Sequence, residues 1–260
     1  MSVTIIRNRV RFLEMDCCIV IPARMGSTRF PGKPLCDLLG KPMIQWVVEA
    51  ARESRISGRI IVATPDSEII DACNRFGAEA LLTRADHPTG TDRIAEISLR
   101  IAADVYVNVQ GDEPLIQPKS IAKCARPLLE DSSIKMGTLF SDCQPHEWDD
   151  PSVVKITCDL NNYALYFSRY PIPYPRNIRE ISVRKHVGIY AYRREVVQAF
   201  ATWEQTPLER AESLEQLRFM EHGVRIKVSE GQGTELAVDT PAQADEVRRI
   251  LLQRALSTSN

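Results

Sequence analysis

A polar loop at residues 22–35, PARMGSTRFPGKPL, concentrates the side chains best suited to chemistry. It carries Arg24, Arg29 and Lys33 among Gly, Ser, Thr and Pro residues. Guanidinium groups, a Lys point charge and backbone N–H groups are suited to the oxygens of a polyphosphate. The alternative is a solvated loop with ordinary surface cations. The buried strand expected just before the loop favours the polyphosphate site.

Two common nucleotide-binding motifs do not describe this loop. Gly26 and Gly32 are one residue too far apart for a Walker A loop, and Pro34 stands where Ser or Thr would bind magnesium. The loop also lacks GxGxxG, which removes the main signature of a nicotinamide-dependent oxidoreductase.

Two acidic residues are candidate ligands of a divalent cation. Asp112 in NVQGDEP follows a predicted strand, where a hard cation would find carboxylate oxygen. Gly-Asp and Glu-Pro are also common turn residues, so a simple β-turn is the alternative. Asp239 precedes a predicted capping box of Thr240 and Gln243, and its charge would favour that helix N-terminus without any metal. The sequence leaves both alternatives open.

Further polar candidates lie in three segments. The loop TRADHPTGTDR, residues 83–93, could recognise a base or ribose edge, or could cap the helix that follows. On the strand KHVGIYAYR, period two places His186 and Tyr190 on one face, and Arg169 could complete a pocket for a polar, acidic molecule. A hydrogen-bonded structural His is the alternative. Glu215 borders the buried stripe of another predicted helix.

The elements that must position these residues alternate between strand and helix. Strands are expected at CIVIPA, GRIIVATP and ADVYVNVQ, and helices at KPMIQWVVEAARES and DSEIIDACNRFGA, with another opening at Pro118. Such alternation predicts an α/β fold, a Rossmann-like, mostly parallel sheet flanked by helices. Ligands bind beyond the carboxyl ends of such strands, where the polar loops lie.

The second half is predicted to be β-rich. We expect a β-rich insertion at about 136–192, whose YPIPYPRNIREISV segment is kept irregular by three Pro. One helix is expected over TPLERAESLEQLR, with Ala211, Leu214 and Leu217 buried. Residues 1–14 are predicted to be an N-terminal extension, and 15–260 a single domain.

Composition excludes several classes of function. Among 260 residues the net charge is -1, so no global field recruits nucleic acid or a membrane. No segment approaches the length of a membrane span. Seven Cys without a CxxC pair indicate reduced thiols and a cytoplasmic location. The four His form no zinc-binding pattern, which makes a zinc site unexpected.

Taken together, the motifs resemble those of the 3-deoxy-manno-octulosonate (Kdo) cytidylyltransferase family, especially its capsule-type members. The resemblance runs from about Cys17 to Arg249 and rests on IPARMGSTRFPGKPL, GKPMIQWV, TRADHPTGTDR, NVQGDEP, ALYFSRYPIPYPRN, KHVGIYAYR, ESLEQLR and VDTP, in that order. Eight ordered motifs are far more specific than any one of them.

The resemblance implies a transferase that joins CTP and Kdo into CMP-Kdo and releases pyrophosphate. The anomeric hydroxyl would attack the α-phosphate in line, assisted by Mg²⁺ or a similar ion on Asp112 and Asp239. The family is homodimeric, with much of the contact made by the β-rich insertion. Its product is used for lipopolysaccharide or capsule.

The resemblance also implies roles for individual residues. Binding of the nucleotide would fall to Pro22, Ala23, Arg24, Ser27, Arg29, Lys33, Thr89, Gly90, Gln110 and Asp112. Binding of the sugar acid would fall to Arg169, His186, Tyr190, Glu215 and Gln216. Catalysis would depend on Asp112, Asp239, Lys33, Arg24 and Arg29.

One departure keeps alternatives open. The family usually has Gly before Val-Asp-Thr-Pro, and this chain has Ala237 there, which could shift the site around Asp239. The same reaction on a sialic acid or an amino-substituted Kdo is therefore an alternative. A second alternative is a paralogue that binds nucleotide or sugar without turnover, although the presence of Asp112, Asp239 and Lys33 argues against it.

Overall fold

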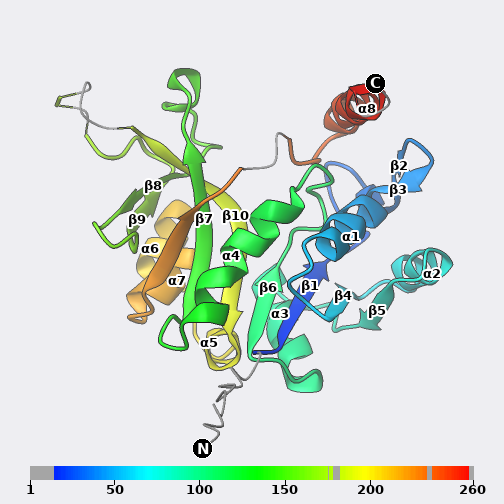
Figure 1. The fold of residues 1–260 in the computed structure, drawn as a ribbon, viewed down its shortest axis with the longest axis horizontal. Coiled ribbons are helices and arrows are strands. Elements are labelled where there is room, and N and C mark those ends of the chain that lie inside the picture. The colour runs from blue at the N-terminus through cyan, green and yellow to red at the C-terminus, as the bar shows by residue number, and fades with distance from the viewer. Residues whose placement is uncertain (1–14, 175, 178–181, 233–235, 258–260) are drawn as a thin grey trace, which may run out of the picture.

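The structure is a computed structural model that describes residues 15–174, 176–177, 182–232 and 236–257. One mixed sheet organises this part of the chain, with the main strand order β11-β7-β10-β6-β1-β4-β5 (Figure 1). These strands are β1 (Cys17–Pro22), β4 (Arg59–Thr64), β5 (Glu79–Leu82), β6 (Val105–Asn108), β7 (Met136–Asp142), β10 (Arg184–Arg193) and β11 (Ile226–Glu230). The prediction for residues 1–14 lies outside the described residues.

The N-terminal half of the sheet is parallel, as predicted. Strand β1 pairs in parallel with both β4 and β6, and β4 pairs in parallel with β5. The crossover helices are α1 (Met43–Glu53), α2 (Ser67–Arg75), α3 (Gly90–Arg100) and α4 (Pro118–Glu130). Because these strands are parallel, their carboxyl ends lie at the same edge of the sheet. The loops that follow β1, β4 and β6 therefore meet there.

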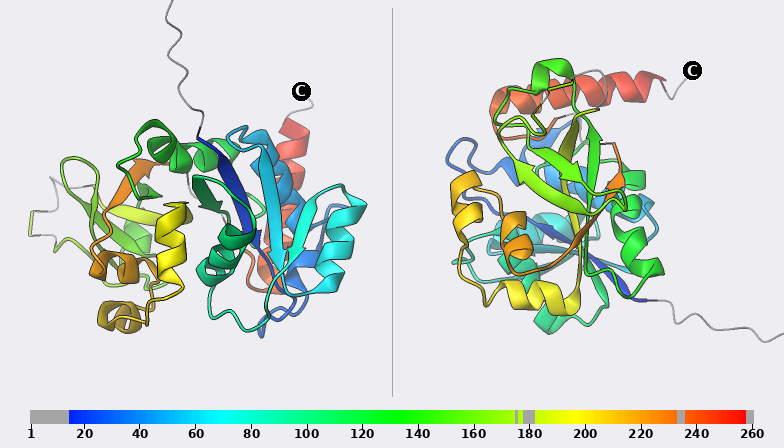
Figure 2. Two further views of the ribbon diagram at one scale, coloured as in Figure 1. Left: turned by 90° about the horizontal axis from the view of Figure 1, so that it is seen from below. Right: turned by 90° about the vertical axis from the view of Figure 1, so that its left-hand side faces the viewer.

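Helices cover both faces of the sheet (Figure 2). Along β1, Ile19 and Ile21 pack with α1, α2 and α4, whereas Cys18 and Val20 pack with α3 and with α5 (Arg194–Phe200) on the other face. The strand is therefore buried on both sides, which explains why it reads as a continuous apolar run. The α/β class predicted from the sequence is confirmed.

The β-rich segment is more closely integrated than predicted. Strand β10 runs antiparallel to β6 and β7, and β7 pairs in parallel with β11, so β7 and β10 belong to the central sheet. Strands β8 (Lys155–Cys158) and β9 (Ala164–Ser168) branch from it, through pairing of β8 with β10 (Figure 1). The stretch 136–192 therefore supplies two strands of the central sheet as well as the β8–β9 pair.

The helix predicted over TPLERAESLEQLR is two helices. Ser213 has a left-handed backbone with φ of 54° and separates α6 (Pro207–Glu212) from α7 (Gln216–Glu221). Ala211 is exposed, contrary to the prediction, whereas Leu214 and Leu217 are buried. The break turns residues 213–216 toward the edge where the β-strand loops meet.

The C-terminal helix closes the fold beside the first polar loop. Helix α8 (Pro241–Ser257) packs Ala244, Val247 and Leu251 against Leu38 and Met43. The short elements at that corner are η1 (Lys33–Leu35), β2 (Asp37–Leu38) and β3 (Lys41–Pro42), and η2 (Pro145–Glu147) lies elsewhere. No helix in the described ranges is long and apolar enough to cross a membrane.

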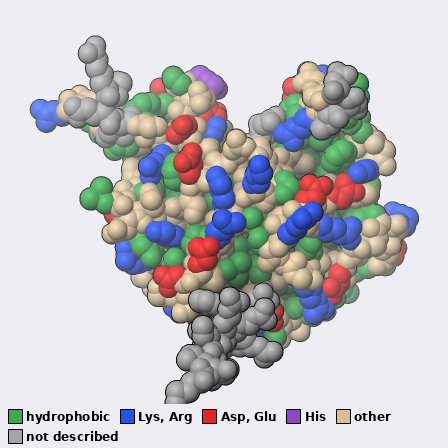
Figure 3. Space-filling model, viewed as in Figure 1, with side chains coloured by type: hydrophobic (Ala, Val, Ile, Leu, Met, Phe, Trp, Pro, Cys, Tyr) green, Lys and Arg blue, Asp and Glu red, His purple; other side chains and the backbone are tan. Residues whose placement is uncertain are grey.

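One face of the molecule carries charged side chains of both signs. Figure 3 shows Lys and Arg side chains interspersed with Asp and Glu over the face seen in Figure 1. This arrangement agrees with the net charge of -1. An anionic ligand must therefore be held by local cations.

Candidate active site

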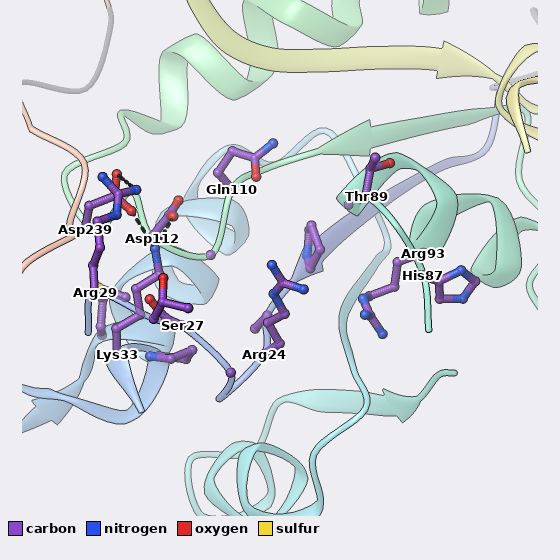
Figure 4. Close-up of a pocket in the computed structure, with 18 of the residues that line it drawn as sticks. Arg24, Ser27, Arg29, Lys33, His87, Thr89, Arg93, Gln110, Asp112 and Asp239 are labelled. Atoms are coloured by element: carbon purple, nitrogen blue, oxygen red, sulfur yellow. Dashed lines mark hydrogen bonds and ion pairs between the residues drawn. The ribbon is translucent and has the colours of Figure 1, made fainter. Parts of the chain in front are cut away.

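A pocket of about 440 Å³ lies where the loops after β1 and β6 meet, and we call it the basic pocket. Its walls come from the β1 loop, from residues 87–93, from residues 110–112 and from Glu215 and Asp239. Every residue of the predicted nucleotide-binding set contributes to this lining. The structure thus brings together side chains that are far apart in the sequence, such as those of Arg24, Arg93 and Asp239 (Figure 4).

The polar loop after β1 has a defined backbone shape. The carbonyl of Met25 accepts hydrogen bonds from the N–H groups of Ser27 and Gly32, both at 3.0 Å. Gly32 adopts φ of 73°, a conformation that side chains disfavour, and η1 begins immediately afterwards at Lys33. The N–H of Met25 also donates to Asp66 at 2.7 Å, which ties the loop to the end of β4. Lys33 is therefore held by a rigid turn.

Lys33 bridges the two predicted metal ligands. Its ammonium donates to Asp112 Oδ2 at 2.6 Å and to Asp239 Oδ1 at 3.0 Å, and Arg29 pairs with Asp239 Oδ2 at 2.9 Å. Burial disfavours the charge on Lys33, but the two carboxylates outweigh it and raise its pKa above the ordinary value. Lys33 is therefore protonated and positively charged at neutral pH.

A backbone contact explains why two distant carboxylates meet. The N–H of Val238 donates to the carbonyl of Asp112 at 2.8 Å, which fixes the next residue, Asp239, beside it. The capping box predicted for α8 is also present, because Gln243 N–H donates to Thr240 Oγ1 at 3.3 Å and Thr240 N–H donates to Gln243 Oε1 at 3.0 Å. Asp239 therefore stands at a helix N-terminus and in the basic pocket at once.

The donor set fits a magnesium ion shared with a phosphate ligand. Within the described ranges no cluster of three or more His, Cys, Asp or Glu could hold a metal ion alone. Mg²⁺ is commonly bound by one or two carboxylates, with water and substrate phosphates completing its coordination. Asp112 and Asp239 match that pattern, and the Lys33 ammonium group lies between their carboxylates.

The opposite side of the basic pocket carries a second basic group. His87 and Arg93 lie there, away from the Lys33 cluster (Figure 4). Arg93 is buried and donates to the side chain of Thr83 and, at 2.9 Å, to the carbonyl of Arg84. Burial, followed by the nearby Arg24, lowers the pKa of Arg93. Sequence reasoning missed both residues, although TRADHPTGTDR contains them.

Thr89 and Gly90 serve the helix and the pocket together. Thr89 caps α3, accepting from Asp92 N–H at 3.3 Å, so the capping alternative is correct. Both residues also line the basic pocket. A Cβ atom at position 90 would lie only 3.3 Å from Pro22 Cγ. Gly90 therefore permits the close approach of this loop to the end of β1.

A second pocket of about 300 Å³ adjoins the basic pocket, and we call it the tyrosine pocket. It shares Gly90, Gln110 and Glu215 with the basic pocket. Its remaining lining consists of Thr91, Asn108, Glu113, His186, Gly188, Tyr190, Tyr192, Ser213, Leu214, Gln216 and Phe219. Two ligands bound in these pockets would meet near the shared residues.

Four of the five predicted sugar-binding residues line the tyrosine pocket. They are His186, Tyr190, Glu215 and Gln216. The hydroxyl of Tyr190 donates to Gln216 Oε1 at 3.1 Å, and His186 Nε2 lies 2.9 Å from Thr138 Oγ1. Burial lowers the pKa of His186 to about 3, so its imidazole is neutral at physiological pH. Burial also raises the pKa of Glu215.

Arg169 is not among the described residues that line either pocket. Its guanidinium donates to the backbone carbonyls of Glu212, at 2.8 Å, and Pro151, at 2.9 Å. The Glu212 carboxylate in turn accepts from the Arg169 N–H at 2.9 Å. Arg169 thus connects the end of β9 to the end of α6. The periodicity of the strand gives no information about these contacts.

Glu113 is a pocket residue that sequence reasoning missed. It directly follows Asp112, and the Glu-Pro pair was interpreted only as part of a turn. In the structure it lines the tyrosine pocket. Burial, followed by the neighbouring Asp112, raises the pKa of Glu113 to about 8.

This fold and this pair of pockets define a cytidylyltransferase. The sequence model of that family, described as Cytidylyltransferase, matches residues 18–226. The chain belongs more narrowly to the family of 3-deoxy-manno-octulosonate cytidylyltransferases. It is 46% identical to the Escherichia coli protein of that name over 90% of this chain and 96% of the relative. It is 49% identical to that of Syntrophus aciditrophicus, over 94% of this chain and all of the relative.

Solved structures agree with this assignment. The structure of CMP:2-keto-3-deoxy-manno-octonic acid synthetase complexed with CTP superposes with a TM-score of 0.90 and 45% identity, covering 92% of this chain and 99% of that one. The 4-diphosphocytidyl-2C-methyl-D-erythritol synthase of Anaerococcus prevotii has a TM-score of 0.63 at 12% identity, over 92% of this chain and 99% of that one. The second likeness shows that the fold alone is shared more widely.

Proposed function

We propose that the protein transfers the CMP unit of CTP to the anomeric hydroxyl of Kdo, giving CMP-Kdo and pyrophosphate. The observation that carries this proposal is the pair of adjoining pockets, one basic and one polar and aromatic, that share Gly90, Gln110 and Glu215. The names of the relatives and the CTP-bound solved structure support the same two substrates.

CTP is placed in the basic pocket. Arg24, Arg29 and Lys33 bind the triphosphate, and the loop containing Thr89 and Gly90 lies against the cytosine. Arg29 and Lys33 stabilise the charge that develops on the departing pyrophosphate, because fixed cations in a partly dry site need little reorganisation. Pro22, Ala23, Ser27 and Gln110 complete the contacts.

Kdo is placed in the tyrosine pocket, where His186, Tyr190, Glu215 and Gln216 bind it. In this pose the anomeric hydroxyl of Kdo faces the α-phosphate of CTP at the junction of the two pockets, next to the residues that line both. Holding both reactants at this junction lowers the entropic barrier to in-line attack. His186 takes part as a neutral hydrogen-bonding group because burial keeps it unprotonated.

Asp112 and Asp239 are the residues that would hold Mg²⁺ or a similar ion. When bound there, such an ion supplies positive charge that polarises a phosphoryl oxygen and lowers the pKa of a coordinated hydroxyl. The two carboxylates also hold Lys33 in place through the contacts described above. Lys33, Asp112 and Asp239 lie together on one side of the basic pocket (Figure 4).

Pyrophosphate release by the purified protein tests this function. The reactions contain CTP and magnesium with Kdo, with a sialic acid or with no sugar, and a matched set contains a chelator. We expect metal-dependent release with Kdo alone. Release with only the sialic acid would keep the chemistry and change the substrate. CTP binding without release on any acid would make the protein a nucleotide-binding paralogue.

We also propose that the protein acts as a homodimer. Large apolar side chains near the β8–β9 arm are exposed, with Leu165 at 59%, Tyr170 at 77% and Tyr174 at 85%. Such a group of side chains is typical of a contact surface. Light scattering should give a dimer mass for the wild type and a smaller mass for Tyr170→Lys/Tyr174→Lys. A monomeric wild type would refute the proposal.

The location that we propose is the cytoplasm. All seven Cys are free thiols, and none of them forms a disulfide in the structure. This state suits a reducing compartment that supplies CTP.

A further inference from the structure

Glu113 lines the tyrosine pocket, and one of its carboxyl oxygens is buried without a hydrogen-bond partner. This atom, Oε2, is inaccessible to solvent and forms no hydrogen bond. Among the described residues that line this pocket none is Lys or Arg, and Glu113 forms no ion pair with any described residue. A buried polar atom without a partner costs folding free energy, so its retention points to a ligand.

Two hydrogen bonds hold the backbone around Glu113 in a turn. Its N–H donates to the Gln110 carbonyl at 3.3 Å, and its carbonyl accepts from Ile116 N–H at 3.0 Å. On the facing strand, a Cβ atom built at Gly188 would lie 3.8 Å from Glu113 Oε1. A larger residue at position 188 would fill this space, so Gly188 leaves room beside the carboxyl group.

The same pocket also contains a buried hydrogen-bond donor without a partner. Gln216 Nε2, a donor, is also buried without a partner, while Gln216 Oε1 already accepts from Tyr190. A hydroxyl group can donate to a carboxyl oxygen and can also accept from an amide. A ligand with several hydroxyls therefore satisfies both walls.

We propose that Glu113 is a specificity-determining residue that hydrogen-bonds a hydroxyl group of the sugar acid. This inference rests on the proposed function and deepens it, because it names the group that reads the polyhydroxylated part of the substrate. Sites that hydrogen-bond a substrate hydroxyl reject analogues that lack it, since the protein group is then left unpaired. Glu113 thus selects hydroxylated acids over deoxy analogues.

Steady-state kinetics of Glu113→Leu and Glu113→Gln test the proposal. For Glu113→Leu we expect the KM for Kdo to rise about 10- to 100-fold while the KM for CTP changes by less than about threefold. Glu113→Gln keeps the size and a hydrogen-bonding oxygen and should recover most of the affinity. Glu130→Leu removes a carboxylate that is 71% exposed on α4 and serves as the matched control.

Analogues of Kdo that each lack one hydroxyl identify the contact. The wild type should lose affinity for one analogue in particular, and Glu113→Leu should no longer distinguish that analogue from Kdo. Unliganded Glu113→Leu should also melt about 2–4 °C above the wild type, because it removes an unpaired buried group. A merely structural Glu113 would instead lower the melting temperature.

Three outcomes would overturn the inference, and a fourth belongs to the proposed function. An unchanged KM for Kdo in Glu113→Leu, or equal losses for Kdo and CTP, would show that Glu113 does not bind the sugar. Identical analogue profiles in wild type and Glu113→Leu would show the same. Absence of turnover with Kdo in the wild-type arm would refute the proposed function, and with it the assignment of this hydroxyl to Kdo.

Discussion

Replacing Lys33 with Met would remove the cation that holds two carboxylates together. Lys33 donates to Asp112 at 2.6 Å, to Asp239 at 3.0 Å and to the Val238 carbonyl at 3.2 Å, and its side chain is only 14% exposed. Met preserves most of the apolar stem and removes the charge. The variant therefore isolates the electrostatic contribution of Lys33 to the site.

The expected loss of stability follows from the geometry. Two unit charges about 5 Å apart repel by about 3 kcal/mol at an effective dielectric constant near 20. Asp112 and Asp239 are 32% and 36% exposed, so water screens part of this repulsion. We expect unliganded Lys33→Met to lose about 2 kcal/mol of unfolding free energy, which lowers its Tm by roughly 4–8 °C.

Divalent cations provide the discriminating assay. Because Lys33 occupies the position between the carboxylates, its removal should leave a site that attracts Mg²⁺ without nucleotide. Millimolar Mg²⁺ should then raise the Tm of Lys33→Met toward that of the wild type, which should itself respond little. Lys135→Met, which breaks an exposed pair with Glu195, is the control and should lose under about 1 kcal/mol.

Two results would refute this reasoning. A Tm for Lys33→Met equal to that of the wild type would mean that the carboxylates do not depend on Lys33. An equal response to Mg²⁺ in both proteins would mean that the ion does not use the space that Lys33 vacates. The expected increase in the KM for CTP is a separate measurement and does not decide between these outcomes.

Three further predictions concern the metal ligands, the tyrosine pocket and the second-half core. Asp112→Asn should lose at least about 100-fold in turnover with an unchanged circular dichroism spectrum, and near-wild-type turnover would exclude a metal role. Because burial lowers the pKa of His186 from 6.5 to about 3, only the unfolded chain gains a proton in that range. Stability should therefore fall by up to about 1.4 kcal/mol per unit as pH drops below 6.5. The unfolding free energy of His186→Asn, measured by urea titration, should lack that dependence on pH. Identical slopes in the wild type and the variant would contradict the lowered pKa of His186. Arg218→Met breaks a pair with Glu209 whose side chains are 5% and 4% exposed, so it should cost about 3–5 kcal/mol. A Tm close to wild type would show that the pair is dispensable.

The order of the elements was predictable because the signals are local. A buried parallel strand reads as an apolar run, and an amphipathic helix repeats its apolar residues at helical spacing. These signals predicted β1, β4, β6, α1 and α2, and they placed the loops that follow the strands at a common edge. The types of residue in those loops predicted the polyphosphate-binding and cation-binding candidates.

The second half was less predictable because strand pairing is not local. The sequence of β7 and β10 indicates strands, but nothing in it says that β10 pairs with β6 and so extends the central sheet. The left-handed backbone of Ser213 likewise breaks an otherwise regular helical pattern. The position of Arg169 depends on carbonyls from other segments, which no periodicity encodes.

By itself the sequence determined an α/β fold, a polar loop rich in cations and two candidate acidic ligands. Only the tertiary structure decided that Lys33 lies between Asp112 and Asp239, that His87 and Arg93 form the far side of the same pocket, and that Glu113 turns into the adjoining one. The physical reason is that these contacts depend on long-range backbone bonds, such as that from Val238 to Asp112, between loops far apart along the chain. Local propensity selects each element, whereas closure of the sheet selects which side chains meet.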